Sequence, residues 1–172
     1  MRRSSAGGQM VAAWVRMTGM SELTFETYDE RIAQGLIASH EHGEGLNGWL
    51  GIRLEQVWPG GLRAVLPVRP EFLTPFGNLH GGVLAAFCDH VLGTVCYPVM
   101  PRGAWAATTE FKLNYLAPVR SGKLEATATI VALSKRTGVV RVEVVNKDRP
   151  VCLAQGTILV MPPKGRADDR SG

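Results

Sequence analysis

The chain has 172 residues, of which 45% are hydrophobic and 20% are charged, values typical of one globular domain with short tails. Its formal net charge is +4, but residues 21–162 carry 13 Lys and Arg against 13 Asp and Glu, so the excess lies at the two ends. A domain without a basic face gives no reason to expect a nucleic-acid partner.

The chain has three cysteines, all in apolar surroundings: Cys88, Cys96 and Cys152. This odd number indicates reduced, packed thiols and a cytoplasmic protein. Because no run of about 18 uninterrupted apolar residues occurs, we predict no membrane span. Residues 1–20 combine arginines with a short apolar patch, which fits a weak signal peptide or a flexible extension. We interpret 1–20 and 163–172 as disordered tails around a domain at 21–162.

The first predicted element is an amphipathic helix within residues 21–40, with Thr24 or Thr27 as its N-terminal cap. Its apolar side chains recur at three- and four-residue spacing: Phe25, Tyr28, Ile32, Leu36 and Ile37. The segment HEHGEG that follows places His40 and His42 beside two glutamates, which suggests a metal. Because glycines interrupt this segment and no further ligands lie nearby, we interpret it as a solvated connector and predict no metal site.

Two strands joined by a hairpin turn are predicted next. Residues 49–58 and 62–68 alternate apolar and polar side chains, and Pro59-Gly60-Gly61 forms the turn. Pro67 cannot donate a ladder hydrogen bond, so we expect it at a strand end or a sheet edge. Four more strands come later in the chain, with short turns that favour antiparallel pairing: 108–116, 123–133, 139–145 and 151–161.

The stretch 74–97 separates these two groups of strands. A turn-rich loop ends at the pair Gly81-Gly82, where a helix begins. Apolar residues cover most of its circumference, which predicts a buried central helix with a six-stranded sheet curled around it, an α+β architecture. Small residues in the strand at 123–133 suit such close packing: Ala126, Ala128 and Ala132. Asp89 is the exception in this helix, because a buried carboxylate is costly unless it is paired.

The N-terminal end of this helix presents free N–H groups, which would polarise an acyl carbonyl as an oxyanion hole does. Asp89 lies eight residues past Gly81, about 12 Å along a helix that rises about 1.5 Å per residue, too far to act beside its own glycine pair. Two copies antiparallel across a twofold axis would bring each helix end to the partner's Asp89. The competing interpretations are a purely structural glycine turn and a hydrogen-bonded structural Asp89. His90 points about 100° away from Asp89, which favours a packed or water-facing histidine over a catalytic base.

Three motifs together carry a family resemblance. N-x-H-G-G at 78–82 is followed by Asp89 nine positions after the His, T-x-F-K-x-N-Y-L-x-P occupies 109–118, and K-R-T-G occupies 135–138. From Trp49 to Met161 the chain resembles hotdog-fold acyl-CoA thioesterases of the phenylacetate-degradation (PaaI-like) type. The resemblance implies a hotdog fold, in which an antiparallel six-stranded sheet wraps a long central helix, with active sites between paired subunits.

The resemblance also implies roles for individual residues. Asp89 corresponds to the catalytic carboxylate, acting as nucleophile or as general base on water. Gly82 would supply the oxyanion-hole amide, with His80 shaping that site, and Thr108 would help to hold the water. The family commonly has an Asn or Gln six residues before the His, where this chain has Thr74, and Asn78 lies nearby at a different offset.

Substrate contacts follow from the same likeness. Gly81 would lie against the substrate, and Lys135 and Arg136 would contact the phosphates of CoA, although solvated turn charges are an equally good interpretation of that pair. The expected reaction is hydrolysis of an acyl-CoA thioester by a homodimer, possibly a dimer of dimers, without metal or other cofactor. Two alternatives remain: a hotdog protein that binds acyl-CoA as a sensor or regulator, and a hotdog dehydratase or hydratase, whose His-containing signatures differ from this one.

Overall fold

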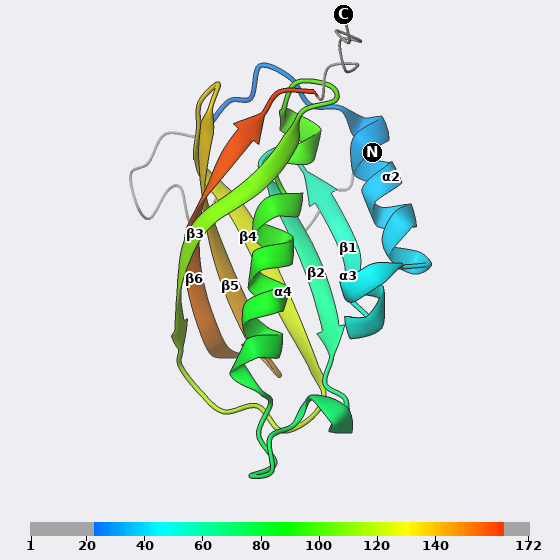
Figure 1. Ribbon diagram of the computed structural model, residues 1–172, viewed down its shortest axis with the longest axis vertical. Helices are drawn as coiled ribbons and strands as arrows, with labels where there is room; N and C mark the ends of the chain where they lie inside the picture. Colours follow the sequence, from blue (N-terminus) through cyan, green and yellow to red (C-terminus); the bar gives the residue numbers. More distant parts are fainter. Residues whose placement is uncertain (1–22, 164–172) are drawn as a thin grey trace, which may run out of the picture.

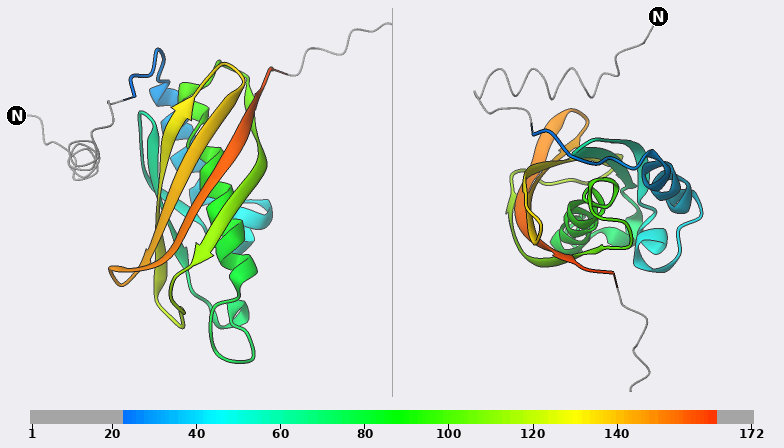
Figure 2. Two further views of the ribbon diagram at one scale, coloured as in Figure 1. Left: turned by 90° about the vertical axis from the view of Figure 1, so that its left-hand side faces the viewer. Right: turned by 90° about the horizontal axis from the view of Figure 1, so that it is seen from above.

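The computed structural model describes residues 23–163, in which one curved sheet surrounds one long helix (Figures 1 and 2). The helices, including two short 3-10 turns, are α2 (Glu30–Glu41), α3 (Gly45–Leu50), η1 (Pro70–Phe72), α4 (Gly81–Thr94) and η2 (Tyr97–Val99). The strands are β1 (Arg53–Trp58), β2 (Gly61–Pro67), β3 (Trp105–Tyr115), β4 (Lys123–Leu133), β5 (Thr137–Asn146) and β6 (Arg149–Met161).

All strand pairs are antiparallel, and the strand order is β1-β2-β4-β5-β6-β3. The view from above shows the sheet curling around α4 (Figure 2). The predicted architecture of six antiparallel strands around a central helix is therefore confirmed. β1 and β3 form the two edges of the sheet. Helix α2 packs beside β1, whereas no further strand pairs with β3 in the described part of the chain.

The inner face of the sheet comes from the period-2 alternation that the sequence predicted. In β4 the side chains of Leu124, Ala126 and Ala128 are fully buried, and the intervening residues are only partly so. Ala132 was expected on the same face and is exposed, because a bulge between Ile130 and Ala132 shifts the register by one residue.

A glycine in β6 sets how closely α4 approaches the sheet. A Cβ atom built on Gly156 would lie 2.6 Å from Leu92 Cδ1 and 2.6 Å from Phe111 Cβ, closer than real Cβ contacts come. Only glycine therefore lets α4 pack this closely against β6 while β3 pairs with the same strand. The three free cysteines are buried, as predicted, and Cys88 Sγ on α4 lies 3.9 Å from Cys152 Sγ on β6.

Helix α4 is not buried on every side, which corrects the prediction from composition. Leu84, Phe87 and Val91 face the sheet and are buried. The opposite face is a strip of small residues interrupted by one acid, with Gly82 and Asp89 exposed and Ala86 and Gly93 partly exposed. By length and composition, Gly81–Val99 is the one segment of residues 23–163 apolar enough to cross a membrane, a test that a buried core helix also passes.

The N-terminal region differs from the prediction in two places. Helix α2 begins at Glu30 and is capped by Asp29 rather than by Thr24 or Thr27, because the Asp29 carboxylate accepts hydrogen bonds from the first backbone N–H groups of the helix. Trp49 and Leu50, expected in the first strand, belong to the short helix α3. α3 ends at Gly51, whose left-handed φ of 76° favours glycine, and the strand starts only after that turn.

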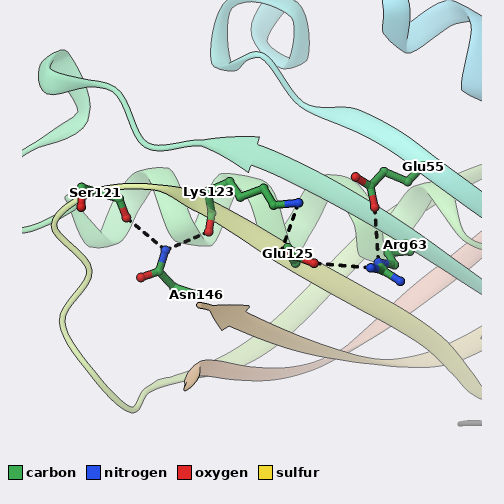
Figure 3. A network of polar contacts seen from close by, with 6 residues as sticks. All are labelled: Glu55, Arg63, Ser121, Lys123, Glu125 and Asn146. Carbon is green, nitrogen blue, oxygen red and sulfur yellow. Dashed lines mark hydrogen bonds and ion pairs between the residues drawn. The ribbon is translucent and has the colours of Figure 1, made fainter. Parts of the chain in front are cut away.

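Polar contacts hold the outer face of the sheet and the loop before β4 (Figure 3). Arg63 lies between Glu55 at 3.3 Å and Glu125 at 3.5 Å, which links three neighbouring strands, and Lys123 also pairs with Glu125. The buried side-chain amide of Asn146 donates to the carbonyl oxygens of Ser121 and Lys123 at 3.1 and 2.8 Å. The loop that connects β3 to β4 is thereby fixed at its β4 end.

Candidate active site

The loop before α4 is a tight hairpin tied to the body of the protein. Thr74 N–H donates to the Asn78 carbonyl at 2.7 Å, and Gly77, with a φ of 74°, allows the chain to reverse. Leu79 N–H donates to the Val119 carbonyl at 2.7 Å, and His80 N–H donates to the Phe72 carbonyl at 2.8 Å. These bonds from two separate segments fix where α4 begins.

His80 caps α4 with its side chain. Its Nδ1 accepts a hydrogen bond from Gly82 N–H at 2.9 Å, so a neutral His80 ring carries its proton on Nε2. Because Gly82 N–H is engaged in this cap, it is not a free donor, which corrects the role that the resemblance implied for it. Within residues 23–163 the N–H of Gly81 donates to no acceptor. The open backbone donor at this end of the helix therefore belongs to Gly81.

Tyr115, at the end of β3, holds the other side of Gly81. Its hydroxyl donates to the Gly81 carbonyl at 3.0 Å, and a Cβ atom on Gly81 would lie 2.8 Å from the Tyr115 oxygen. A residue with a side chain would displace the ring, so glycine allows the hydrogen bond between Tyr115 and the Gly81 carbonyl to form. The sequence placed Tyr115 correctly on one face with Phe111 and Leu113 but gave no sign of this contact, because 34 residues separate it from Gly81.

A cleft of about 460 Å³ opens beside this helix end. Gly81, Asn78 and Tyr115 provide its polar groups. The rest of its wall is apolar: Leu79, Leu84, Leu116, Ala117, Pro118 and Val119. The free Gly81 N–H therefore stands next to a largely apolar cleft, where a hydrogen bond to a carbonyl oxygen meets little competition from water.

Asp89 lies about two turns further along α4 and is exposed in the single chain. The prediction that Asp89 is buried is therefore wrong for the single chain, where the argument from the cost of burial does not apply. Asp89 borders a recess of about 140 Å³ between α3 and α4. The recess is lined by Leu46, Asn47, Leu50, Ile52, Ala86, Asp89 and His90.

Thr108 on β3 lies near the next turn of the same helix face. A Cβ atom on Gly93, four residues past Asp89, would lie 4.0 Å from Thr108 Oγ1. The register shift between Thr108 and Glu110 places Thr109 out of the regular ladder, and the Thr109 hydroxyl donates to the Thr157 carbonyl at 3.0 Å. Thr108 and Asp89 thus come to one side of the molecule, although no hydrogen bond joins them within the described residues.

Thr74 and Asn78, the two candidates for orienting the reacting groups, lie in the hairpin before α4. Thr74 Oγ1 and Asn78 Oδ1 are buried atoms without a hydrogen-bond partner inside residues 23–163. Buried polar atoms are normally hydrogen-bonded, so both side chains have an acceptor available beside the helix end. The geometry of one subunit does not separate the two candidates.

Lys135 and Arg136 lie in the exposed turn between β4 and β5, far from Gly81 in the same chain. Arg136 is fixed through its carbonyl, which accepts from Val160 N–H at 2.9 Å near the start of β3. Tyr115 marks the opposite end of β3, where α4 begins (Figure 1). One subunit therefore does not bring the basic pair to the helix N-terminus.

A pair of histidines joins α2 to α4 beside Asp89. His40 Nδ1 lies 2.7 Å from the Leu36 carbonyl and must donate to it, so His40 Nε2 accepts from His90 Nε2 at 2.7 Å. Burial, and then the neighbouring His40, lower the pKa of His90 to about 4, with Asp89 acting in the opposite direction. His90 is thus a packed residue, as its direction on the helix predicted. In the described residues no three His, Cys, Asp or Glu side chains are placed to hold a metal.

The fold and the helix-end motif define the class: a hotdog protein with an HGG turn at the start of its central helix. The sequence model of the thioesterase superfamily matches residues 76–153 of this chain. The chain is 32% identical over 120 residues to the esterase PA1618 of Pseudomonas aeruginosa, covering 69% of this chain and 83% of that one. It is 30% identical over 121 residues to the 1,4-dihydroxy-2-naphthoyl-CoA hydrolase of Escherichia coli, covering 68% and 87%. The chain belongs to the thioesterase superfamily.

Solved structures agree with this assignment. A mutant of thioesterase PA1618 superposes with a TM-score of 0.69 at 29% identity, covering 76% of this chain and 94% of that one. A hypothetical thioesterase of Streptococcus pneumoniae, solved with coenzyme A, has a TM-score of 0.60 at 27% identity and covers 65% and 87%. The E. coli PaaI protein of the phenylacetic acid degradation operon, with a TM-score of 0.70 at 24% identity and coverage of 77% and 96%, shares the fold. The predicted hotdog fold and thioesterase family are confirmed.

Proposed function

We propose that this protein hydrolyses acyl-CoA thioesters as a homodimer, with Asp89 of one subunit acting opposite the Gly81 N–H of the other. The observation that carries the proposal is the exposed strip of α4 that holds Asp89, beside the uncovered edge strand β3, together with the free Gly81 N–H at the start of the same helix. The CoA part of the substrate is supported by two relatives, one named as a CoA-ester hydrolase and one solved with coenzyme A.

The dimer follows from distance and from the unpaired edge. Asp89 stands about 12 Å from the start of its own helix, at about 1.5 Å per residue, so one subunit cannot present both groups to one thioester. A twofold axis across α4 would run two helices antiparallel and bring each Gly81 to the partner's Asp89. The small side chains of Gly82, Ala86 and Gly93 permit close approach, and an 11-residue edge strand offers backbone groups for pairing.

In this arrangement the thioester carbonyl accepts a hydrogen bond from Gly81 N–H, with the Nε2 proton of His80 as a second donor. Negative charge that develops on this oxygen is stabilised by the helix end. The partner's Asp89 either takes a proton from water as the water adds to the carbonyl carbon, or adds to that carbon itself. The carbon–sulfur bond then breaks, and the thiolate of CoA leaves and takes up a proton. On the second route the acyl group remains on Asp89 as a mixed anhydride, which water hydrolyses to release the acid and restore the carboxylate.

The remaining candidates take supporting roles in the proposal. Thr108 helps to hold the water near Asp89, and Thr74 or Asn78 orients the reacting groups through its free acceptor. Antiparallel pairing also moves the basic turn of Lys135 and Arg136 to the end of the molecule where the partner's α4 begins. In that position the turn contacts the phosphates of CoA.

The decisive experiment measures release of free thiol from a panel of acyl-CoAs. Asp89→Asn should lower kcat/KM at least about 100-fold with the fold intact, because it removes the base or nucleophile. An unchanged rate would remove Asp89 from the mechanism. Tight binding of acyl-CoA with no turnover by the unaltered protein would instead support a sensor or regulator.

A mixing experiment tests the shared site. Asp89→Asn and Gly81→Ala subunits should each be nearly inactive, and exchange between them should restore about a quarter of the activity, because half of the dimers then hold one intact site of two. Absence of recovery after proven subunit exchange would mean that each chain carries its own complete site.

A further inference from the structure

The recess beside Asp89 is not used by the proposed chemistry and has a composition of its own. Leu46 and Leu50 of α3, Ile52 and Ala86 form apolar walls, and Leu46 is the most exposed of them at 63%. The polar groups of the recess are Asn47, Asp89 and His90. Its lining includes no Lys or Arg. A mostly apolar recess that contains a carboxylate and no cation does not suit the phosphate-bearing part of a thioester substrate.

The acyl group of the substrate suits this recess, because it is apolar and carries no phosphate. In the proposed reaction the thioester carbon reaches Asp89, and its two substituents leave in different directions: the sulfur leads to CoA and the remaining bond leads to the acyl group. Burying the methylenes of an acyl group strengthens binding, because apolar surface is removed from water. The recess, which begins at Asp89, is therefore a natural site for the acyl group.

The volume of the recess limits what it holds. At about 140 Å³, it compares with an apolar cavity of about 150 Å³ that binds benzene. We infer that α3 restricts this enzyme to compact acyl groups, up to about the volume of one six-membered ring, and that Leu46 and Ala86 determine this limit. The inference rests on the proposed function and specifies its substrate class.

Helix α3 lies beside β1 (Figure 1), and contacts with the loop before it and with Arg69 tie it to other segments. A Cβ atom on Gly43 would lie 2.8 Å from Gly48 Cα, so the loop before α3 touches the helix backbone directly. Gly51 N–H donates to the carbonyls of Asn47 and Gly48, each at 3.0 Å. Arg69 Nη2 donates to the Trp49 carbonyl at 2.5 Å. These contacts hold α3 in place, so a long acyl chain would collide with it.

The test compares two substitutions with opposite effects on the recess. kcat/KM is measured from acetyl-CoA to dodecanoyl-CoA. For the unaltered protein we expect a fall of about tenfold or more for each step beyond the size limit, the usual effect of a methylene that does not fit. Leu46→Ala enlarges the recess and should move the limit toward longer chains. Leu46→Trp fills it and should move the limit toward shorter ones, without altering the strip of α4 that faces the partner. Leu153→Ala, a matched leucine on the outer face of β6, should leave the profile unchanged.

Equal rates for hexanoyl-CoA and dodecanoyl-CoA, or an identical profile in all three variants, would overturn the inference while leaving the proposed function intact.

A second measurement is independent of turnover. Calorimetry on the Asp89→Asn protein gives the affinity of each acyl-CoA relative to free CoA. This difference should grow up to the size limit and fall beyond it, and Leu46→Ala should shift the maximum. A maximum in affinity at one acyl length, with no hydrolysis by the unaltered protein, would reject the proposed function and support the size limit. Affinity without a maximum would reject the size limit.

Discussion

The exposed face of α4 contains two regions that are built in different ways. Its first turn is held by directional hydrogen bonds: His80 caps Gly82, and Tyr115 binds the Gly81 carbonyl. The turn at Asp89 is bordered instead by apolar side chains of α3 and by the histidine pair. Directional bonds fix the orientation of a donor, whereas apolar walls fix mainly a volume. We therefore expect changes in the first region to alter rate, and changes in the side chains that surround Asp89 to alter selectivity or stability.

The largest effect should come from Gly81→Ala. The new methyl group would push the Tyr115 ring away, break its hydrogen bond to the Gly81 carbonyl and stand beside the Gly81 N–H in the cleft. We therefore expect kcat to fall at least about 100-fold, as when an oxyanion-hole donor is lost. Gly82→Ala is the matched control. Its methyl group would lie 3.0 Å from the flexible His80 ring, and it should cost much less. Steady-state thiol release gives both values; equal losses would contradict the difference between the two glycines.

A smaller loss should follow Tyr115→Phe, which keeps the ring and removes the hydrogen bond to the Gly81 carbonyl. A bond of this kind contributes about 0.5–1.5 kcal/mol, so we expect a fall of up to about tenfold in kcat with KM little changed. Comparing kcat with KM identifies Tyr115 as a positioning residue. A rise in KM alone would place its effect on substrate binding in the neighbouring cleft instead.

The smallest effect on rate, and a distinct one on stability, is expected at the histidine pair. The folded protein lowers the pKa of His90 from 6.5 to about 4, so the unfolded chain binds the proton more readily. Folding stability should therefore be complete above about pH 6.5 and decrease as the pH falls toward 4, by on the order of 2 kcal/mol. His90→Asn should weaken this dependence. Denaturant titrations at several pH values measure it; an unchanged slope would show that another group is responsible.

The sequence predicted the sheet and the central helix because their burial patterns are local. Alternation in β4 and the apolar run of α4 follow directly from side-chain order. The exposure of Asp89 could not be predicted in this way. A helix with apolar residues on most sides gives no sign of which narrow strip the sheet leaves open. Helix α3 was missed for a related reason: Leu50 continues the apolar alternation of Ile52 and Leu54, and the turn at Gly51 that separates the helix from the strand depends on backbone conformation.

The site was predictable only in part. The HGG motif and Asp89 lie within ten residues of each other, so their spacing is visible in the chain. Tyr115 reaches Gly81 across 34 residues, and His40 reaches His90 across 50. Such contacts depend on strand register and helix packing, which a single sequence does not specify. The cap on Gly82 was missed because it depends on the rotamer and tautomer of His80.

Gly156 has a practical consequence for anyone who wishes to redesign this protein. Because β6 carries no side chain there, Leu92 and Phe111 rest almost directly on the strand backbone, and α4 cannot shift inward to absorb a change on its other side. Variant libraries aimed at Leu46 and Ala86 would thus act on a scaffold whose frame stays in place, so that altered product profiles could be attributed to the substituted side chains themselves.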